Sequence, residues 1–266
     1  MLPIISVIIP CYNSGEYLPE AIKSVKEHQN SALIEIIIVD DGSTDQITID
    51  LLDRLKHTEC IKILNIRNSG PAAARNVGAR AAQSTYLLFL DSDNKISPKY
   101  IDNSIEVFNA NKSVGVVYGN PEFFGEVGGD FYFFPQKFDM NSILISNYID
   151  TCAVIRKKVW EEIGGFDEDR NLTQEDWDFW IRVGKTKWKF YYTNEVMFYY
   201  RIRKNSHVSI THNDEEKRKL LKYIYSKHSD LFIDNYFTMA SELAKIKHEK
   251  SRPVKTFIKK VLGINK

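Results

Sequence analysis

The chain has 266 residues, of which 43% are hydrophobic and 27% charged, and its formal net charge at pH 7 is +1. This length accommodates one large α/β domain, or one domain with a helical extension. The small net charge argues against a general attraction to nucleic acid, and no apolar run approaches the roughly 18 residues of a membrane span.

The first part of the chain alternates apolar runs with helical patterns. Short apolar runs typical of buried strands occur at Ile4–Ile9, Ile34–Val39, Ile61–Ile66 and Tyr86–Leu90. Apolar spacing and alanine content predict helices between them, at Tyr17–Gln29, Ile47–Leu55 and Ala72–Ala82. This alternating order predicts an α/β fold with a mostly parallel, doubly wound sheet.

The second part of the chain has a less regular pattern. A helix after Pro98 precedes further predicted elements: a strand at Val114–Tyr118, an irregular and partly β segment at Phe123–Phe138, a helix at Lys158–Ile163 capped by Gly164-Gly165, a helix at Glu175–Val183, and strands at Lys189–Tyr192 and Val196–Tyr200. Helices are predicted from Asn213 onward. We therefore expect a main domain over residues 1–210, with halves 1–120 and 121–210, and a helical extension over residues 211–266.

The cysteines and the N-terminus indicate where the protein resides. Cys11, Cys60 and Cys152 are odd in number and far apart, which favours free thiols in a reducing compartment and gives no zinc-binding spacing. Met1-Leu2-Pro3 supplies no basic region before the first apolar run, so no signal peptide is expected. A cytoplasmic protein is the prediction.

An acidic cluster follows the second predicted strand. Val39-Asp40-Asp41-Gly42-Ser43 leads into a helix, and Asp, Ser and Thr are also common helix caps and turn residues. The first strand ends in Pro10-Cys11-Tyr12-Asn13, where the tyrosine ring is suited to stacking on a base while a nearby carboxylate accepts its N–H. Because strand ends form the ligand crevice of open α/β sheets, two such ends favour a nucleotide pocket.

A second acidic cluster, Asp91-Ser92-Asp93, follows the strand that ends at Leu90. One of the two aspartates is suited to binding a ribose hydroxyl and the other to ligating a metal. A single carboxylate ligand is typical of Mg²⁺ or Mn²⁺ when phosphates supply the remaining ligands. The alternative is an ordinary acidic turn at a strand end.

The third cluster, Glu175-Asp176-Trp177-Asp178, begins a predicted helix. Acidic residues are favoured there by the helix dipole alone. Asp176 is nevertheless a candidate general base toward an incoming hydroxyl group. Trp177, Phe179 and Trp180 are expected in the core or in a pocket wall.

Taken in order, these runs resemble family-2 glycosyltransferases of the GT-A fold, a large inverting family that builds bacterial surface glycans such as O-antigen and capsule. The resemblance extends from near Ile5 to near Ser209, and the ordered set is far more specific than any single motif. The matching runs are Val7-Ile8-Ile9-Pro10-Cys11-Tyr12-Asn13, Val39-Asp40-Asp41-Gly42-Ser43-Thr44-Asp45, Asn68 with Gly70-Pro71-Ala72-Ala73-Ala74-Arg75-Asn76, Asp91-Ser92-Asp93, Gly164-Gly165-Phe166-Asp167-Glu168, and Glu175-Asp176 with Trp180 and Arg182.

The resemblance implies roles for the matching residues. It implies a nucleotide-sugar site made of Pro10, Tyr12, Asp41, Arg75, Asp91, Ser92 and Arg203. Within this site Asp41 would accept from the uracil N–H. Asp93 would ligate Mn²⁺ or Mg²⁺ at the diphosphate of a UDP-sugar, and Asp176 would be the catalytic base, oriented by Glu175.

One departure from the family pattern concerns a histidine. Many relatives place one shortly after a Tyr-Arg pair, whereas this chain has Tyr200-Arg201, then Arg203-Lys204, and His207 only later. His207 is the candidate second metal ligand. The alternatives are that Arg203 and Lys204 bind the diphosphate as point charges, or that His207 is a surface loop residue.

The C-terminal segment is strongly basic. Residues 245–266 hold eight Lys or Arg and one acidic residue, Glu249, so they carry +7 and the remainder carries −6. After Pro253, apolar residues fall on one helical face, a pattern typical of a helix in an anionic membrane interface. The alternative is a helix packed on the domain. Membrane contact through residues 250–266, at the inner face of a bacterial plasma membrane, would suit a polyprenyl-diphosphate-linked acceptor.

The sequence therefore predicts an inverting transferase that moves a sugar from a UDP-sugar to a glycan hydroxyl. A nucleotidyltransferase is the first alternative, but Pro10-Cys11-Tyr12-Asn13-Ser14 is no glycine-rich phosphate loop. A non-catalytic sugar-nucleotide-binding protein is the second, although Asp93 and Asp176 are both present. No Gly-x-Gly-x-x-Gly follows a strand, which argues against a dinucleotide oxidoreductase.

Overall fold

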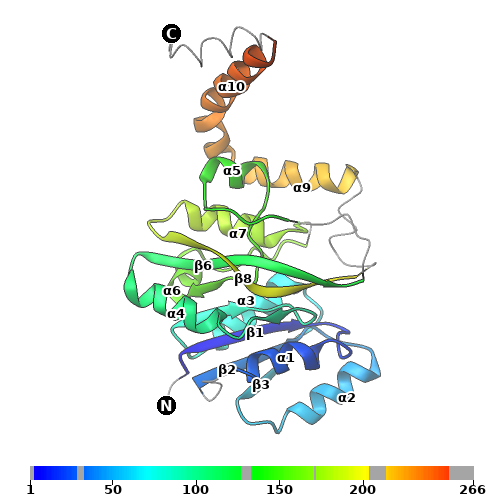
Figure 1. Ribbon diagram of the computed structural model, residues 1–266. Helices are drawn as coiled ribbons and strands as arrows, with labels where there is room; N and C mark the ends of the chain where they lie inside the picture. Colours follow the sequence, from blue (N-terminus) through cyan, green and yellow to red (C-terminus); the bar gives the residue numbers. More distant parts are fainter. Residues whose placement is uncertain (1–2, 29–32, 127–132, 171, 204–213, 252–266) are drawn as a thin grey trace. The chain divides into compact units, whose positions relative to one another are not determined.

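The computed structural model describes residues 3–28, 33–126, 133–170, 172–203 and 214–251. The chain divides into two compact units, Met1–Leu220 and Leu221–Lys266, with the division inside helix α9. The first unit contains the sheet and the helices that cover it (Figure 1).

The described elements follow the predicted alternation through the first half of the chain. In order they are β1 (Ile5–Cys11), α1 (Leu18–Lys26), β2 (Ile34–Asp40), α2 (Gln46–Leu55), β3 (Ile61–Asn65), α3 (Pro71–Ala81), β4 (Tyr86–Phe89), β5 (Lys95–Ile96), α4 (Tyr100–Ala110), β6 (Val114–Gly125), α5 (Met140–Ile145), β7 (Val154–Arg156), α6 (Lys157–Glu162), α7 (Glu175–Gly184), β8 (Lys189–Ile202), α9 (Asp214–Lys227) and α10 (Ser229–Ser251).

The strands form one mixed sheet in the order β3-β2-β1-β4-β7-β6-β8-β5. Strands β3, β2, β1 and β4 are mutually parallel, and β6 is parallel to β8. Strand β7 runs antiparallel to both of its neighbours, β4 and β6. The predicted α/β fold with a mostly parallel sheet is confirmed, and the reversed strand β7 was not predicted.

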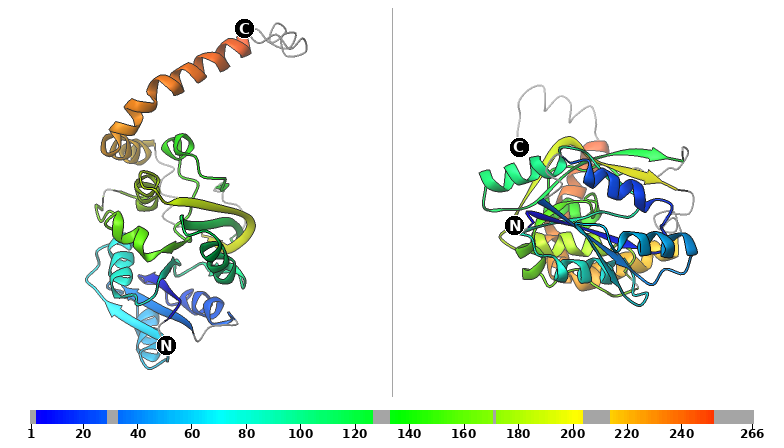
Figure 2. Two further views of the ribbon diagram at one scale, coloured as in Figure 1. Left: turned by 90° about the vertical axis from the view of Figure 1, so that its left-hand side faces the viewer. Right: turned by 90° about the horizontal axis from the view of Figure 1, so that it is seen from below.

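Alternate residues of β1 enter opposite faces of the sheet, as expected for a buried parallel strand. Ile5, Val7 and Ile9 belong to the core cluster that also contains residues of α1 and α4. On the other face Ile8 lies under α3, where Gly78 allows a close approach because a Cβ there would lie 2.4 Å from Ile8 Cγ2. Helices α1 and α4 thus cover one face and α3 the other (Figure 2).

The second half departs from the predicted strand boundaries. Strand β6 continues beyond the predicted end at Tyr118 to Gly125, and the two strands predicted at Lys189–Tyr192 and Val196–Tyr200 form one strand, β8. The register of this pair shifts after Tyr118. The break predicted between Tyr192 and Val196 therefore corresponds to an irregularity in the pairing of β6 with β8, because both strands continue beyond it.

The cap predicted for α6 is confirmed. Gly164 and Gly165 have φ angles of +78° and +80°, the left-handed region that glycine adopts without strain. The Gly165 N–H donates to Trp160 O at 2.9 Å. The turn ends α6 and leads the chain into Phe166, which is 3% exposed.

The second unit contains the end of α9 and the helix α10. Exposed apolar side chains on α10 include Ile233, Leu243 and Ile246. Over the described residues, no helix combines the length and the apolar character needed to cross a membrane. The basic amphipathic tail predicted after Pro253 lies outside the described residues.

Candidate active site

Three strand ends bring the sequence-predicted residues to one edge of the sheet. Strands β1, β2 and β4 are parallel, so their carboxyl ends and the loops that follow lie together. Pro10 and Tyr12 come from the end of β1, and Asp41 comes from the end of β2. Asp91 follows β4.

Asp41 is buried and organises the start of α3. Its Oδ1 accepts from Ser69 N at 2.6 Å, and its Oδ2 accepts from Gly70 N at 2.8 Å. Gly70 has a φ of +92° and supplies no side-chain cap, so Asp41 anchors the turn before the helix. Each carboxylate oxygen keeps a second lone pair, and the role of Asp41 as nucleobase acceptor stays a prediction.

Asn13 joins the loop after β1 to the loop after β2. Its Oδ1 accepts from Thr44 N at 2.7 Å and from Asp45 N at 3.1 Å, and its backbone N–H donates to Ser43 Oγ. The residue has a φ of +49°, a conformation that asparagine tolerates better than most residues. The two runs predicted to bind the nucleotide are thus held together, next to the half-exposed ring of Tyr12.

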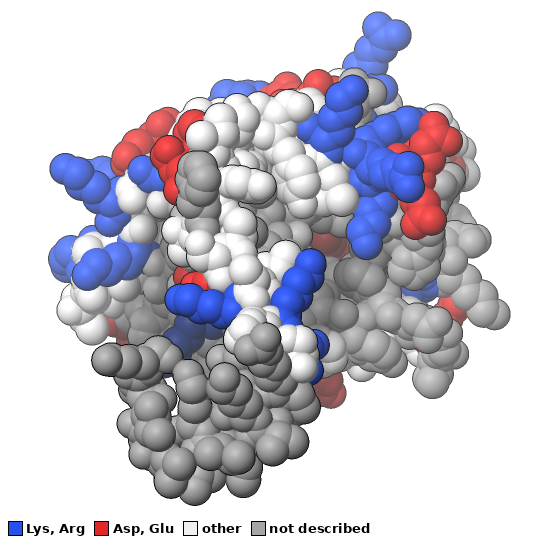
Figure 3. Space-filling model, turned by 90° about the horizontal axis from the view of Figure 1, so that it is seen from above, with Lys and Arg blue, Asp and Glu red and all other residues white. Residues whose placement is uncertain are grey.

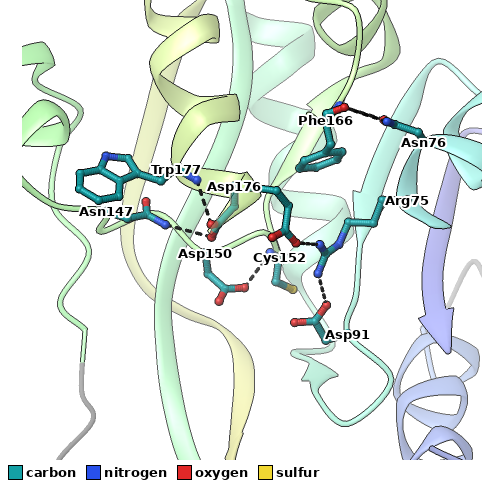
Figure 4. Close-up of polar contacts among 10 residues, drawn as sticks. Arg75, Asn76, Asp91, Asn147, Asp150, Cys152, Phe166, Asp176 and Trp177 are labelled. Carbon is teal, nitrogen blue, oxygen red and sulfur yellow. Dashed lines mark hydrogen bonds and ion pairs between the residues drawn. The ribbon is translucent and has the colours of Figure 1, made fainter. Parts of the chain in front are cut away.

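Arg75 on α3 links the second acidic cluster to the third. Its Nη1 donates to Glu175 Oε1, and its Nη2 donates to Asp91 Oδ1 at 2.7 Å (Figure 4). Burial alone would lower the pKa of Arg75, but the two carboxylates outweigh it and raise that pKa. The sequence predicted Arg75 among the residues around the nucleobase; the structure places its guanidinium between Asp91 and Glu175.

Asp93 lies beside an arginine pair from β8 and the residues after it. Arg203 Nη2 is 2.6 Å from Asp93 Oδ2, and Arg201 Nε donates to the Asp93 carbonyl at 2.9 Å. Burial and the nearby Asp91 raise the pKa of the Asp93 carboxyl, and Arg203 opposes the change. Ser92, between the two aspartates, is buried.

The carboxylates of Asp93 and Asp91 are of the chemical type that a hard cation prefers. Across the described ranges, no group of three or more His, Cys, Asp or Glu side chains is placed to hold a metal ion. Mg²⁺ and Mn²⁺ nevertheless accept one or two carboxylates when phosphates complete their coordination. Asp93, with Asp91 two residues away, would supply the carboxylate of such a site, although its Oδ2 is paired with Arg203 in this structure. His207, the predicted second ligand, lies outside the described residues.

Asp176 at the start of α7 is held in place by two donors. Asn147 Nδ2 donates to its Oδ2 at 2.9 Å, and Trp177 N donates to its Oδ1 at 2.8 Å (Figure 4). Burial, with the charge of the adjacent Glu175, raises the pKa of Asp176 to about 7. A carboxyl group that titrates near neutral pH is suited to general base catalysis.

The remaining residues of the third cluster have packing roles. Trp177, Phe179 and Trp180 are buried, as predicted for a core or pocket wall. Asp178 is fully buried and accepts from Arg182 Nε at 2.7 Å. Asp176 and Glu175 are thus the two acidic residues of this cluster that face the other carboxylates.

Two polar residues of the site were missed by the sequence reasoning. Asn147 donates a hydrogen bond that positions Asp176. Burial and the nearby charges of Asp91 and Asp176 raise the pKa of Asp150. Asn147 and Asp150 both lie between α5 and β7, in a segment without an apolar run of strand length. No local pattern therefore assigned a role to either residue.

Comparisons with known proteins agree with this arrangement. Residues 6–164 match the family model described as glycosyl transferase family 2. An uncharacterized glycosyltransferase of Haemophilus influenzae is 30% identical over 260 residues, covering 94% of this chain and 99% of its own length. TuaG of Bacillus subtilis, named as a teichuronic acid biosynthesis glycosyltransferase, is 30% identical over 84% of this chain and 87% of its own.

A solved structure shows the same fold. Staphylococcus aureus TarS 1-349 in complex with UDP-GlcNAc superposes with a TM-score of 0.64 at 19% identity, covering 85% of this chain and 73% of that chain. The matched family residues 6–164 include the strand-end aspartates and Arg75. With relatives that align over nearly its whole length, the chain belongs to glycosyl transferase family 2 and is a glycosyltransferase with the GT-A fold.

Proposed function

We propose that this glycosyltransferase moves a sugar from a UDP-sugar to a hydroxyl group of a glycan acceptor, with inversion at the anomeric carbon. The observation that carries the proposal is the chain of contacts from Asp91 through Arg75 to Glu175. It links the segment proposed to bind the donor, Asp91-Ser92-Asp93, to the residue that precedes the proposed base. The TarS structure with UDP-GlcNAc supports a UDP-sugar as donor.

In the proposed reaction the acceptor oxygen attacks the anomeric carbon in one step. The new C–O bond forms as the bond to the diphosphate oxygen breaks, and UDP leaves with that electron pair. Asp176 takes the proton of the attacking hydroxyl group. Arg75 holds Glu175 as a charged partner, so this neighbouring carboxylate keeps its position while Asp176 changes protonation.

The leaving diphosphate requires positive charge. Arg203 is 38% exposed and is positioned by Asp93 and by the ring of Tyr17, 5.0 Å from its guanidinium carbon, so it is suited to binding a phosphate oxygen. Asp93 would also hold Mn²⁺ or Mg²⁺, which as a Lewis acid would neutralise charge on the diphosphate. His207 remains the proposed second protein ligand.

An Asp93→Ala variant tests the cation. In the wild-type protein, Mn²⁺ should strengthen UDP binding measured by isothermal titration calorimetry, and a chelator should reverse the effect. The variant should bind UDP equally with and without Mn²⁺. A UDP affinity of the wild-type protein that changes with neither Mn²⁺ nor chelator would contradict a metal site.

We propose a role in surface polysaccharide synthesis, by analogy with the teichuronic acid biosynthesis in the name of TuaG. We propose a lipid-linked acceptor because the basic segment 250–266 would suit contact with a membrane. The proposed membrane contact rests on the basic residues 250–266 and on the exposed apolar residues of α10. The face drawn in Figure 3 carries Lys and Arg in separate groups with Asp and Glu among them. Deleting residues 250–266 should reduce binding to anionic liposomes, and unchanged partition would contradict the contact.

Product analysis separates the proposed function from its alternatives. The protein is incubated with UDP-Glc, UDP-Gal, UDP-GlcNAc and UDP-GalNAc in the presence of Mn²⁺, and released products are identified. Release of UDP is expected. Pyrophosphate formed from a sugar phosphate and UTP would instead indicate a nucleotidyltransferase, and UDP-sugar binding without turnover of any acceptor would indicate a binding protein.

A further inference from the structure

The segment before β7 holds Asp150 in a fixed position. One residue earlier, the Ile149 carbonyl accepts from Trp180 Nε1 at 2.8 Å, and two residues later the Cys152 carbonyl accepts from Tyr100 Oη at 2.6 Å. Both donor side chains are fully buried. The backbone on each side of Asp150 is therefore anchored to the core, and a residue held in this way is preorganised for recognition.

One oxygen of the Asp150 carboxyl group accepts a hydrogen bond within the protein, and the other is available to a ligand. Its Oδ1 accepts from Cys152 N at 2.7 Å. Among the hydrogen bonds of the described residues, none is made to its Oδ2. Figure 4 shows Asp150 below Asp176, with Cys152 between it and Asp91 and with Arg75 on the far side of Cys152.

A carboxylate at this place is unfavourable for folding. Burial and the charge of Asp91 raise the pKa of Asp150 well above its ordinary value. The nearby guanidinium of Arg75 is already shared by Asp91 and Glu175. An asparagine would give the same bond to Cys152 N without charge repulsion, so fold stability does not account for the aspartate. Such residues are typical of functional sites.

We propose that Asp150 is a specificity-determining residue for the donor, whose Oδ2 accepts a hydrogen bond from a hydroxyl group of the transferred sugar. This inference rests on the proposed function. Asp150 lies within electrostatic range of Asp91, the carboxylate assigned to the donor. An acidic side chain offers no positive charge to phosphate, whereas its free oxygen accepts from hydroxyl groups, so the proposed partner is the sugar and not the diphosphate.

The test compares Asp150→Asn with wild-type protein. The substitution preserves the shape of the side chain and the bond to Cys152 N, while an NH2 group replaces the acceptor Oδ2. Affinities for UDP and for the four UDP-sugars named above are measured by calorimetry with Mn²⁺. Because the asparagine Nδ2 donates where the aspartate Oδ2 accepts, a sugar hydroxyl group would lose its acceptor, and an unsatisfied polar group of this kind costs about 1–3 kcal/mol. We therefore expect about 10- to 100-fold weaker binding of the sugar nucleotide that wild-type protein prefers, with UDP affinity unchanged. Asp53→Asn on α2, an exposed carboxylate, is the control and should leave both affinities unchanged.

Thermal unfolding of the same variants separates recognition from structure. Asp150→Asn should unfold at the same temperature as wild-type protein or higher, because the unfavourable charge is gone. Lower stability together with weaker UDP binding would show a structural residue and overturn the proposal. Unchanged donor affinity with an increased KM for the acceptor would also overturn it. A wild-type protein that binds UDP but prefers no UDP-sugar over it would contradict the inference alone, and one that binds neither would contradict the proposed function with it.

Discussion

Arg75 Nη2 donates to Asp91 Oδ1 at 2.7 Å, so an arginine of α3 is fixed to the carboxylate that follows β4. The same guanidinium binds Glu175 at the start of α7. Arg75 is 4% exposed, and its charge is buried between these two partners. One side chain thus bridges the Asp91-Ser92-Asp93 segment and the start of α7, where the proposed base Asp176 lies.

Replacing Arg75 should damage both stability and turnover. Arg75→Ala leaves two carboxylates without their partner, and breaking a buried ion pair in this way costs about 3–5 kcal/mol of unfolding free energy. Arg80→Ala, on an exposed position of the same helix, should change it by about 0.5 kcal/mol or less. Urea unfolding measures both values. Equal effects of the two substitutions would contradict the bridging role.

Asp41 and Asp40 offer a matched pair of substitutions. Asp41 uses both oxygens on Ser69 N and Gly70 N, whereas Asp40 uses Oδ1 alone on Ser43 N. Asparagine has one acceptor oxygen, so it can replace the Asp40 contact but only half of the Asp41 contact. We expect Asp41→Asn to cost about 1–3 kcal/mol of unfolding free energy and Asp40→Asn distinctly less. The reverse order would contradict the anchoring of α3 by Asp41.

Gly164 and Gly165 separate backbone strain from crowding. Both have positive φ, but a Cβ on Gly164 meets no atom within 4 Å, whereas one on Gly165 would lie 2.5 Å from Asn76 Oδ1. That oxygen accepts from Trp160 Nε1 and from Phe166 N. Gly165→Ala should therefore lower the unfolding free energy by about 1–3 kcal/mol more than Gly164→Ala. Equal losses in thermal or urea unfolding would show that crowding at Asn76 has no effect.

The pKa of about 7 for Asp176 predicts two pH dependences. A base must be ionised, so kcat/KM should rise with pH through about 7 and then level off. The pKa of Asp176 in the folded protein is raised above the ordinary carboxyl value of about 3.9. Protonation of Asp176 therefore stabilises the fold, and this contribution is fully present below about pH 3.9. This contribution is lost as the pH rises toward 7. The unfolding free energy of wild-type protein minus that of Asp176→Asn should accordingly fall between pH 4 and 8. If kcat/KM keeps its plateau value until the pH falls below 5, this assignment is contradicted.

The first half of the fold and the strand-end residues were predictable because their signals are local. Each buried parallel strand is a short apolar run, and the polar residues follow where the run stops, as at Asp41 and Asp91. The cap at Gly164-Gly165 is likewise local, since positive φ requires glycine there. Strand β7 was missed because Val154–Arg156 is too short to show a period.

Contacts across long separations could not be read from the sequence. Arg75 and Glu175 are one hundred positions apart, and their pairing depends on how α3 and α7 pack, which no spacing reveals. Asp150 follows no strand and begins no helix. It reaches the site because Trp180 and Tyr100 hold its segment, and neither contact has a local sequence signature.

The most direct test of the account is the turnover of Asp176→Asn measured beside its affinity for UDP. The variant keeps an acceptor for Trp177 N but cannot take a proton, so kcat for release of UDP to an acceptor should fall by about 10²-fold or more. The dissociation constant of UDP, measured by calorimetry, should stay within a factor of about two, because the proposal assigns Asp176 to the acceptor hydroxyl group and not to the nucleotide. A variant with near-normal kcat would contradict the assignment of Asp176 as the base that carries the transfer.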